Sequence, residues 1–342
     1  MCLKIGVKKT LSKFGGISIA NSHPFSLGKN GYQISPLLQE LMVYAGQSDR
    51  YEHCNETLKK FINLEVSSTQ VHRVTNTYGE QIGKEEDTGR NLPLVLNEVL
   101  YAQADGSMIL TRDDGWKEVK LGRVFKSGDR FQIGNKGWIE HSKYTAHLGD
   151  HKEFIKKTEP FIESYGQLRN RLVFLSDGAT WIKNWVSDSF PEAIHILDYY
   201  HASEHLYGFT ENYFKDKKEG KQWAKEQEEL LLESCVEQVI YNIKTLSIGC
   251  KETEKTRVKL VQYYQSNIER MDYKRFKLIG NGTIGSGAIE AANRTVVQER
   301  LKLSGQRWEG AQNVLNLRAT RMSGQWNKVI QLVKTNFYKE AA

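Results

Sequence analysis

The stretch from Leu172 to Leu206 constrains the fold of this chain more than any other. It opens with a short apolar run that breaks at Asp177, and a second apolar run, Ala193–Leu197, ends at Asp198. Between the two runs, large apolar residues recur at helical spacing. The order strand, helix, strand predicts parallel strands joined by a right-handed crossover. Because the carboxyl ends of such strands open on the same edge of a sheet, we expect Asp177 and Asp198 to share one crevice.

Length, charge and cysteine usage limit the class of protein. The 342 residues are enough for two or three domains, and the net charge of +7 favours a polyanionic partner. The sequence has no apolar run long enough to span a bilayer and no signal-peptide core near its start, so we expect a cytoplasmic protein. The four cysteines are widely scattered, which predicts free thiols and no zinc or disulfide framework.

Residues 1–92 form the predicted N-terminal region, because a polar segment broken by glycine and proline separates them from the strands that follow. Within 35–80, two short helical patterns joined by a turn have the proportions of a helix-turn-helix, with Ser67 or Ser68 capping the second helix and Val71 and Val74 facing inward. Its outward residues are suited to contact phosphates or base edges of DNA: Thr69, Gln70 and Arg73. A plain helical hairpin in an N-terminal bundle is the alternative.

Residues 93–206 read as the first part of an α/β core. Three extended segments come first, the third of them from Lys136 to Gly149. An amphipathic helix, His151–Tyr165, and then the strand, helix and strand described above follow. This order is that of the RNase H-like fold, a mixed sheet with helices on its faces. It predicts one acid on the first strand and another at the tip of the fourth, and Asp105 and Asp177 occupy those positions. Gly178, next to Asp177, permits the close backbone approach that a phosphate-facing site requires.

Asp105 lies inside the first predicted strand, where aspartate is unfavourable. Asp105-Gly106 is also a common hairpin turn. However, apolar residues flank it on both sides and a better turn, Arg112–Gly115, follows at once. This arrangement favours a functional acid at Asp105.

The third acid is expected after a helical insertion. Residues 207–277 are highly charged and almost entirely helical in pattern, and residues 278–342 return to the core and end in C-terminal helices. A glycine-rich loop, Gly280–Gly287, precedes a helix that carries Glu290 in its first turn. A glutamate there also interacts favourably with the helix N-terminus. A site with two divalent cations needs a further carboxylate, and Glu290 is in a position to supply it.

Three sequence blocks between roughly Tyr101 and Trp326 carry a family resemblance. They are DGSMI; SDGATWI with LDYYHASEHL; and GSGAIEAANR followed by ERLKLSGQRWEGAQNVLNLRA. Together they resemble the DDE transposases of bacterial insertion sequences, in particular the Kra-type group related to the Mutator-like superfamily. Members are commonly longer at the N-terminus, which is consistent with a missing N-terminal piece here.

The resemblance implies an enzyme that cleaves and joins DNA strands at the inverted-repeat ends of its own element. Asp105, Asp177 and Glu290 match the catalytic acids of the family and would hold two Mg²⁺ or Mn²⁺ ions. Double-stranded DNA, as terminal repeats and as target, would be the partner of a homo-oligomer in the nucleoid.

Basic residues that follow Glu290 would neutralise DNA phosphates near the cut, although about half of them are expected to lie on a solvated helix face. They are Arg294, Arg300, Lys302, Arg307, Arg318 and Arg321. Trp308 is suited to stack on a base unpaired during cleavage, and burial in the core is its other expected fate.

A different class of enzyme is also compatible with the sequence. His201 and His205 stand four residues apart on one helix face with Asp198 just before them, a ligand set for zinc or iron in a hydrolase or oxygenase. That reading leaves Asp105 and Glu290 unexplained. We therefore expect Asp198, His201 and His205 to support the metal site or the structure, with Asp198 capping the helix that carries the two histidines. A DNA-binding protein with the transposase fold and no activity is a third possibility.

Overall fold

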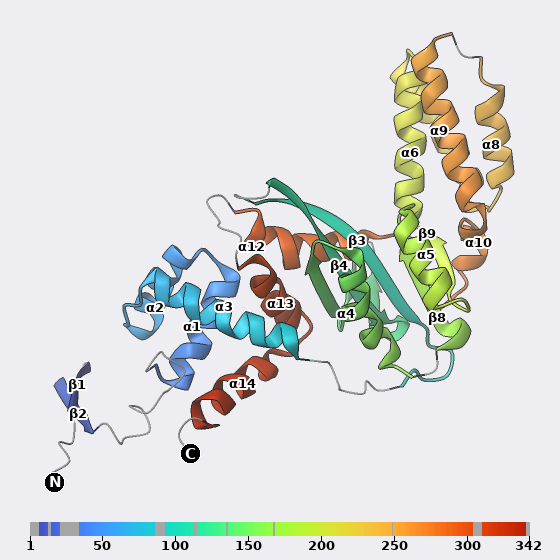
Figure 1. Ribbon diagram of the computed structural model, residues 1–342. Helices are drawn as coiled ribbons and strands as arrows, with labels where there is room; N and C mark the ends of the chain where they lie inside the picture. Colours follow the sequence, from blue (N-terminus) through green and yellow to red (C-terminus); the bar gives the residue numbers. More distant parts are fainter. Residues whose placement is uncertain are drawn as a thin grey trace. The chain divides into compact units, whose positions relative to one another are not determined.

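The computed structural model divides the chain into two compact units, coloured along the sequence in Figure 1. The residues that it describes are 7–12, 15–20, 34–85, 93–111, 115–134, 136–166, 168–247, 249–303 and 310–339. Unit 1 comprises Met1–Glu86, Leu110–Gly115 and Val296–Ala342, and unit 2 comprises Asp87–Ile109 and Trp116–Thr295. The sequence predicted that residues 278–342 complete the α/β core and end in C-terminal helices, and in the structure the chain from Val296 onward belongs to unit 1.

A five-stranded sheet forms the centre of unit 2, in the order β7-β4-β3-β8-β9. β3, β8 and β9 are parallel neighbours, while β7 pairs antiparallel with β4. The predicted order of three strands, helix, strand, helix, strand is found, and the mixed α/β class is confirmed. The elements are β3 (Leu100–Thr111), β4 (Gly115–Lys126), β7 (Lys143–Leu148), α4 (His151–Glu163), β8 (Leu172–Ser176), α5 (Thr180–Ser189) and β9 (Ile194–Leu197).

One further hairpin interrupts this order. β5 (Arg130–Ile133) and β6 (Lys136–Ile139) pair antiparallel as a small separate sheet. The sequence predicted one extended segment from Lys136 to Gly149, which the structure divides between β6 and β7. Each of these strands has only four residues and most of them are exposed, so neither contributes a buried run to the core.

Helices cover both faces of the five-stranded sheet, because successive side chains of a strand point to opposite sides. Leu100 and Phe174 pack with Phe154 of α4 and Trp185 of α5. Residues of the opposite parity, including Leu175, pack with the helices that follow β9. The strands carry apolar residues at both parities for this reason.

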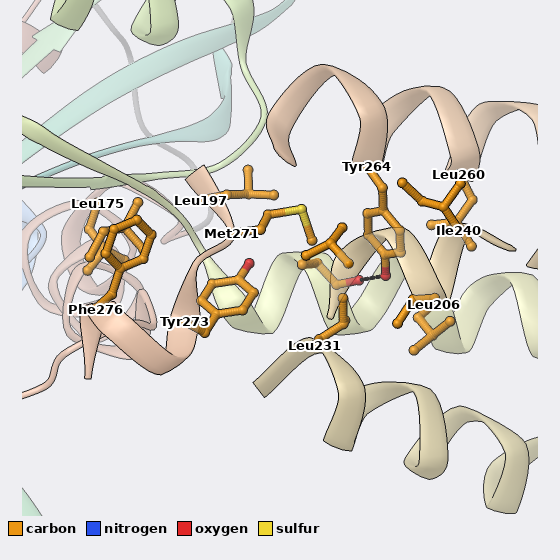
Figure 2. Packing of buried hydrophobic residues seen from close by; sticks show 14 of the residues in the cluster. Leu175, Leu197, Leu206, Leu231, Ile240, Leu260, Tyr264, Met271, Tyr273 and Phe276 are labelled. Atoms are coloured by element: carbon orange, nitrogen blue, oxygen red, sulfur yellow. Dashed lines mark hydrogen bonds between the residues drawn. The ribbon is translucent and has the colours of Figure 1, made fainter. Parts of the chain in front are cut away.

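The helices after β9 share one hydrophobic core with the sheet. Leu206, Leu231 and Tyr264 belong to the same cluster as Leu175 and Leu197 of the sheet, as Figure 2 shows. The Tyr264 hydroxyl donates a hydrogen bond of 2.8 Å to a carbonyl of α6. Figure 1 shows α6, α8 and α9 extending away from the sheet. These helices are α6 (Tyr199–Tyr213), α7 (Lys217–Leu232), α8 (Val236–Thr245), α9 (Lys251–Asn267) and α10 (Tyr273–Phe276).

Unit 1 is a helical bundle in which N-terminal and C-terminal helices share a core. Ser67 caps α3 by accepting a hydrogen bond from the Gln70 amide at 3.2 Å, and Val71 and Val74 are fully buried, as predicted. The bundle consists of α1 (Pro36–Ser48), α2 (Tyr51–Ile62), α3 (Ser68–Lys84), α12 (Glu299–Leu301), α13 (Ala311–Met322) and α14 (Trp326–Lys339). A hairpin of β1 (Val7–Ser12) and β2 (Gly15–Ala20) precedes them. Within the described part of the chain, no helix has both the length and the apolar character that crossing a membrane requires.

Candidate metal centre

Three aspartates form a row across the parallel strands of unit 2. The last registered positions of β3, β8 and β9 stand side by side, and the next residue on each strand is Asp105, Asp177 and Asp198. The Asp198 amide continues the pairing by donating to the carbonyl of Ser176 at 2.8 Å. Asp105 lies within β3 and not in a turn, and Asp177 follows the last residue of β8. The register places Asp177 and Asp198 at the carboxyl ends of neighbouring parallel strands, as expected, and it places Asp105 beside Asp177.

Asp198 is a buried acid with one unused oxygen. Its Oδ1 accepts hydrogen bonds from the amides of Tyr200 and Ser286, both at 3.0 Å, so it caps α6 as predicted. Its Oδ2 has no hydrogen-bond partner among the described residues, although the side chain is fully buried. Burial raises the pKa of Asp198. A buried carboxylate oxygen without a donor is suited to hold a cation.

His201 and Glu290 complete a group around that oxygen. Asp198, His201 and Glu290 each offer a ligand atom, and these atoms lie within 4.8 Å of one another. His201 Nε2 is 3.7 Å from Asp198 Oδ2. Ser286 links the two acids, because its amide donates to Asp198 and its hydroxyl donates to Glu290 Oε1 at 2.6 Å. Two carboxylates and an imidazole form a donor set that fits a divalent cation.

Glu290 reaches this position from a short helix, α11 (Gly287–Ala292), that follows the glycine-rich loop. Within the loop, a Cβ on Gly285 would lie 2.3 Å from the Tyr200 ring, so only glycine permits this approach of the backbone to α6. The first-turn position predicted for Glu290 is found, and its contact with Ser286 gives the side chain a defined direction.

His205 lies outside this group, although it stands one helical turn after His201. Its ring is exposed and packs against the ring of Tyr263, with centroids 4.3 Å apart. The alternative ligand set predicted from the sequence was Asp198, His201 and His205. In the structure the third member of that group is Glu290 and not His205.

Asp105 is held by the same segment that carries Glu290. Asn293, one turn after Glu290, donates a hydrogen bond to Asp105 Oδ2, and the Gly106 amide donates to Oδ1 at 2.7 Å. Burial raises the pKa of Asp105, and the negative charge of Asp177 raises it further, while His201 opposes the rise. Asp105, Asp177 and His201 are therefore close enough to interact electrostatically.

Asp177 is fixed by backbone contacts. Its Oδ1 accepts a hydrogen bond of 2.9 Å from the Ala179 amide, and its carbonyl accepts one of 3.2 Å from Arg270. The sequence suggested that Gly178 leaves room for a phosphate. In the structure the space is taken by Tyr263, because a Cβ on Gly178 would lie 2.4 Å from its ring.

Arg270 and Tyr263 are neighbours of Asp177 that the sequence did not reveal. Arg270 is buried and also donates to Asn267 Oδ1 at 2.7 Å and contacts His195 Nε2 at 2.9 Å. Burial and the Arg270 charge lower the pKa of His195 to about 3, so this imidazole is neutral and its Nε2 accepts a hydrogen bond from Arg270. Arg270 lies 93 residues after Asp177 in the sequence, and no local sequence pattern predicts a contact over that separation.

The residues predicted to contact DNA fall into three groups. Thr69 and Arg73 are exposed on α3 and Gln70 is half-buried, and Arg294 and Lys302 are exposed as well. Arg307 and Trp308 lie outside the described residues.

Arg300 forms the third group and corrects a prediction. It is fully buried, its Nε donates to the carbonyl of Gly46 at 3.1 Å, and its guanidinium lies 4.9 Å from the Tyr51 ring centroid. Arg318 is buried too and donates to the carbonyl of Gln47 at 3.1 Å. Both arginines satisfy carbonyls at the end of α1, where a helix leaves its acceptors unpaired, so neither is available to a phosphate.

Compared with models of known protein families and with curated proteins, the chain matches none. The centre itself consists of acids on or directly after three parallel strands and on one short helix, with one imidazole and two orienting side chains, Ser286 and Asn293.

Proposed function

We propose that this protein is a DDE transposase that cleaves and joins DNA strands at the inverted-repeat ends of its own insertion sequence. The observation that carries the proposal is the row of Asp105, Asp177 and Asp198 on neighbouring parallel strands, with Glu290 held beside it through Ser286. The strand order and the helices on both faces support an RNase H-like reading of unit 2. The protein would act on DNA as a homo-oligomer in the nucleoid, since two element ends have to be processed together.

The residues present fit divalent cations. Asp105, Asp177 and Glu290 would hold two Mg²⁺ or Mn²⁺ ions, and of these three acids Glu290 is the one grouped with Asp198 and its unused oxygen. Carboxylate oxygens are the ligands that these hard cations prefer. When bound, the ions would stabilise the negative charge that develops on the attacking and leaving oxygens during in-line displacement at phosphorus.

The protein's own side chains would set the geometry of the reaction. Asn293 fixes the direction of the Asp105 carboxylate, and Ser286 fixes that of Glu290. Ser286 and Asn293 flank the short helix α11 that carries Glu290, so one segment supplies the third acid and supports the first. No side chain needs to form a covalent bond with DNA, because water or a DNA 3′-hydroxyl is the nucleophile.

Cleavage of the element's own ends tests the proposal. With Mg²⁺, a duplex that carries the terminal repeat is expected to be cut at the repeat boundary, and a chelator should stop the reaction. A duplex of the same length with a scrambled repeat is the control. Equal cutting of both duplexes, or none of either, would contradict the proposed function.

The raised pKa values of Asp105 and Asp198 predict a pH dependence of metal binding. A raised pKa keeps each carboxyl protonated to a higher pH than an ordinary aspartate, whose pKa is about 3.9. Protons therefore compete with the cation for these carboxylates. As the pH is lowered, Mn²⁺ affinity is expected to begin falling at a pH that is still above the ordinary aspartate pKa. Calorimetric titration of Mn²⁺ into folded protein at a series of pH values measures this. An affinity that stays constant down to about pH 4 would exclude raised pKa values at the metal ligands.

DNA affinity is expected to fall steeply with salt, because exposed basic residues such as Arg73, Arg294 and Lys302 would displace counterions from phosphates. Fluorescence anisotropy with the terminal-repeat duplex measures the slope. Arg73→Gln should weaken binding by roughly 10-fold or more, whereas Lys334→Gln, an exposed cation on α14, is the matched control. An affinity that is independent of both salt concentration and DNA sequence would contradict the proposal that α3 recognises the terminal repeat.

A second candidate function is favoured by one observation. Asp198, His201 and Glu290 alone form a compact set of three ligands, as in mononuclear zinc or iron hydrolases and oxygenases. One stoichiometric zinc or iron in protein purified without added metal would support this function. A third reading, a DNA-binding protein without activity, predicts salt-dependent DNA binding and no cleavage under any metal.

A further inference from the structure

A cavity of about 560 Å³ lies in unit 2 beside the candidate metal centre. Its wall includes Ala288 and Ala291 of α11, the helix that also carries Glu290. The side chains in the wall that can bind a ligand through charge, hydrogen bonds or ring stacking are Arg123, Arg130, Trp138, Tyr200 and Thr283. They come from β4, the β5–β6 hairpin, α6 and the glycine-rich loop. None of them has a role in the proposed chemistry at the acids.

Two guanidinium groups give the cavity a positive charge. Arg123 is buried, and its donors contact neutral oxygens, Ser142 Oγ at 3.0 Å and the carbonyl of Ala288. Arg130 donates to the carbonyl of Asn281 at 3.0 Å and to Thr283 Oγ1 at 2.8 Å. Within the described part of the chain, neither forms an ion pair with a carboxylate. Cations without counter-ions in a partly enclosed wall favour a bound anion, and guanidinium matches phosphate well.

Aromatic rings form the other half of the wall. Trp138 and Tyr200 remain 46% and 56% exposed, which is high for rings in a concave site. Trp138 is supported from behind by Phe131, with ring centroids 5.7 Å apart and planes 21° apart. On the loop side, a Cβ on Gly287 would meet nothing within 4 Å, so free space reaches the backbone there. A supported, exposed indole beside arginines is a platform on which a base can stack.

We propose that this cavity binds one unpaired nucleotide of a DNA strand, with its phosphate on Arg123 and Arg130 and its base against Trp138 and Tyr200. The volume lies in the range of small-ligand sites and is too small for a duplex. The proposal rests on the proposed function, because the shared helix α11 would place such a nucleotide next to the phosphodiester held by Glu290 and its partners. A separated strand end near the cut is the source of an unpaired nucleotide.

The test is binding of a labelled duplex with a short single-stranded 3′ overhang, measured by fluorescence anisotropy without divalent metal. Trp138→Ala and Arg130→Gln are expected to weaken overhang binding by roughly 10- to 100-fold and to leave blunt-duplex binding unchanged. The matched controls are Trp116→Ala, an indole 65% exposed on β4, and Arg275→Gln, an exposed arginine on α10. Circular dichroism and thermal melting confirm that each variant is folded.

Two outcomes would overturn the inference. The first is overhang affinity in Trp138→Ala and Arg130→Gln equal to that of the controls. The second is competition by a free deoxynucleoside monophosphate as strong as that by the overhang, since the site would then take a soluble nucleotide. Because no metal is present, overhang binding is scored separately from cleavage, so failure of the proposed function and failure of this inference give different results.

Discussion

Asp177→Asn is expected to lower Mg²⁺-dependent strand cleavage by roughly 10³-fold, the rate equivalent of about 4 kcal/mol of lost transition-state stabilisation. The substitution removes a charge from the row of acids and hardly changes the shape of the side chain. The oxygen that accepts from the Ala179 amide at 2.9 Å is retained in asparagine, so the start of α5 keeps its contact. DNA binding and the melting temperature should therefore stay close to those of the unmodified protein. Gel assays of the labelled terminal-repeat duplex measure the rate.

Substitutions of other residues test which acids are required for cleavage. Asp188→Asn, on an exposed position of α5, is the matched control and should cut normally. Asp198→Asn keeps one acceptor oxygen but places an amide donor beside His201, so we expect lower thermal stability and only a partial loss of activity. If Asp177→Asn still cuts while His201→Ala and Asp198→Asn abolish activity at unchanged stability, the centre is the mononuclear set of Asp198, His201 and Glu290.

Arg318→Met is expected to lower the free energy of unfolding of unit 1 by about 3 kcal/mol, since hydrogen bonds to charged donors contribute about 1.5–3 kcal/mol each. Burial lowers the pKa of Arg318 to about 10, so the group is still a cation at neutral pH. It donates to the carbonyls of Val296 at 2.7 Å and Gln47 at 3.1 Å and contacts Glu299 at 3.3 Å. Methionine fills the same space but leaves these acceptors unpaired. Urea denaturation followed by circular dichroism measures the loss.

Arg300→Met is the informative comparison. Arg300 is also buried, but its Nη1 and Nη2 have no hydrogen-bond partners among the described residues. Its Nε donates one hydrogen bond, to the carbonyl of Gly46. Replacing a poorly paired buried cation with an apolar side chain is often neutral, so a change within about 1 kcal/mol is expected. Equal losses in the two variants would mean that bulk, and not the pairing of the α1 carbonyls, accounts for the effect.

Much of unit 2 could be predicted because its signals are local. Apolar runs that stop at Asp177 and Asp198 marked the strand ends, and the turn after Leu110 showed that Asp105 lies inside a strand. The cap at Ser67 and the inward valines of α3 followed from residue type and helical spacing. In each of these cases a few neighbouring residues contain the whole physical reason for the structure.

The missed features depend on partners that are distant in sequence. Nothing near Arg300 shows that its side chain meets a carbonyl 254 residues earlier, so a basic run was interpreted as a DNA-contacting surface. Arg270 behind Asp177 and Asn293 on Asp105 are contacts of the same kind. The β5–β6 hairpin was missed because its strands have only four residues each, too few for a clear periodic signal, and most of them are exposed.

The most direct measurement on the central claim is electron paramagnetic resonance of protein titrated with Mn²⁺. If Asp105, Asp177 and Glu290 converge on one two-ion centre, two Mn²⁺ ions about 3.5–4 Å apart should give a spin-coupled spectrum. Asp105→Asn and Glu290→Gln should each abolish that coupling, although the two residues come from β3 and α11. A single uncoupled Mn²⁺ signal that is lost in His201→Ala and unchanged in Asp105→Asn would contradict the account.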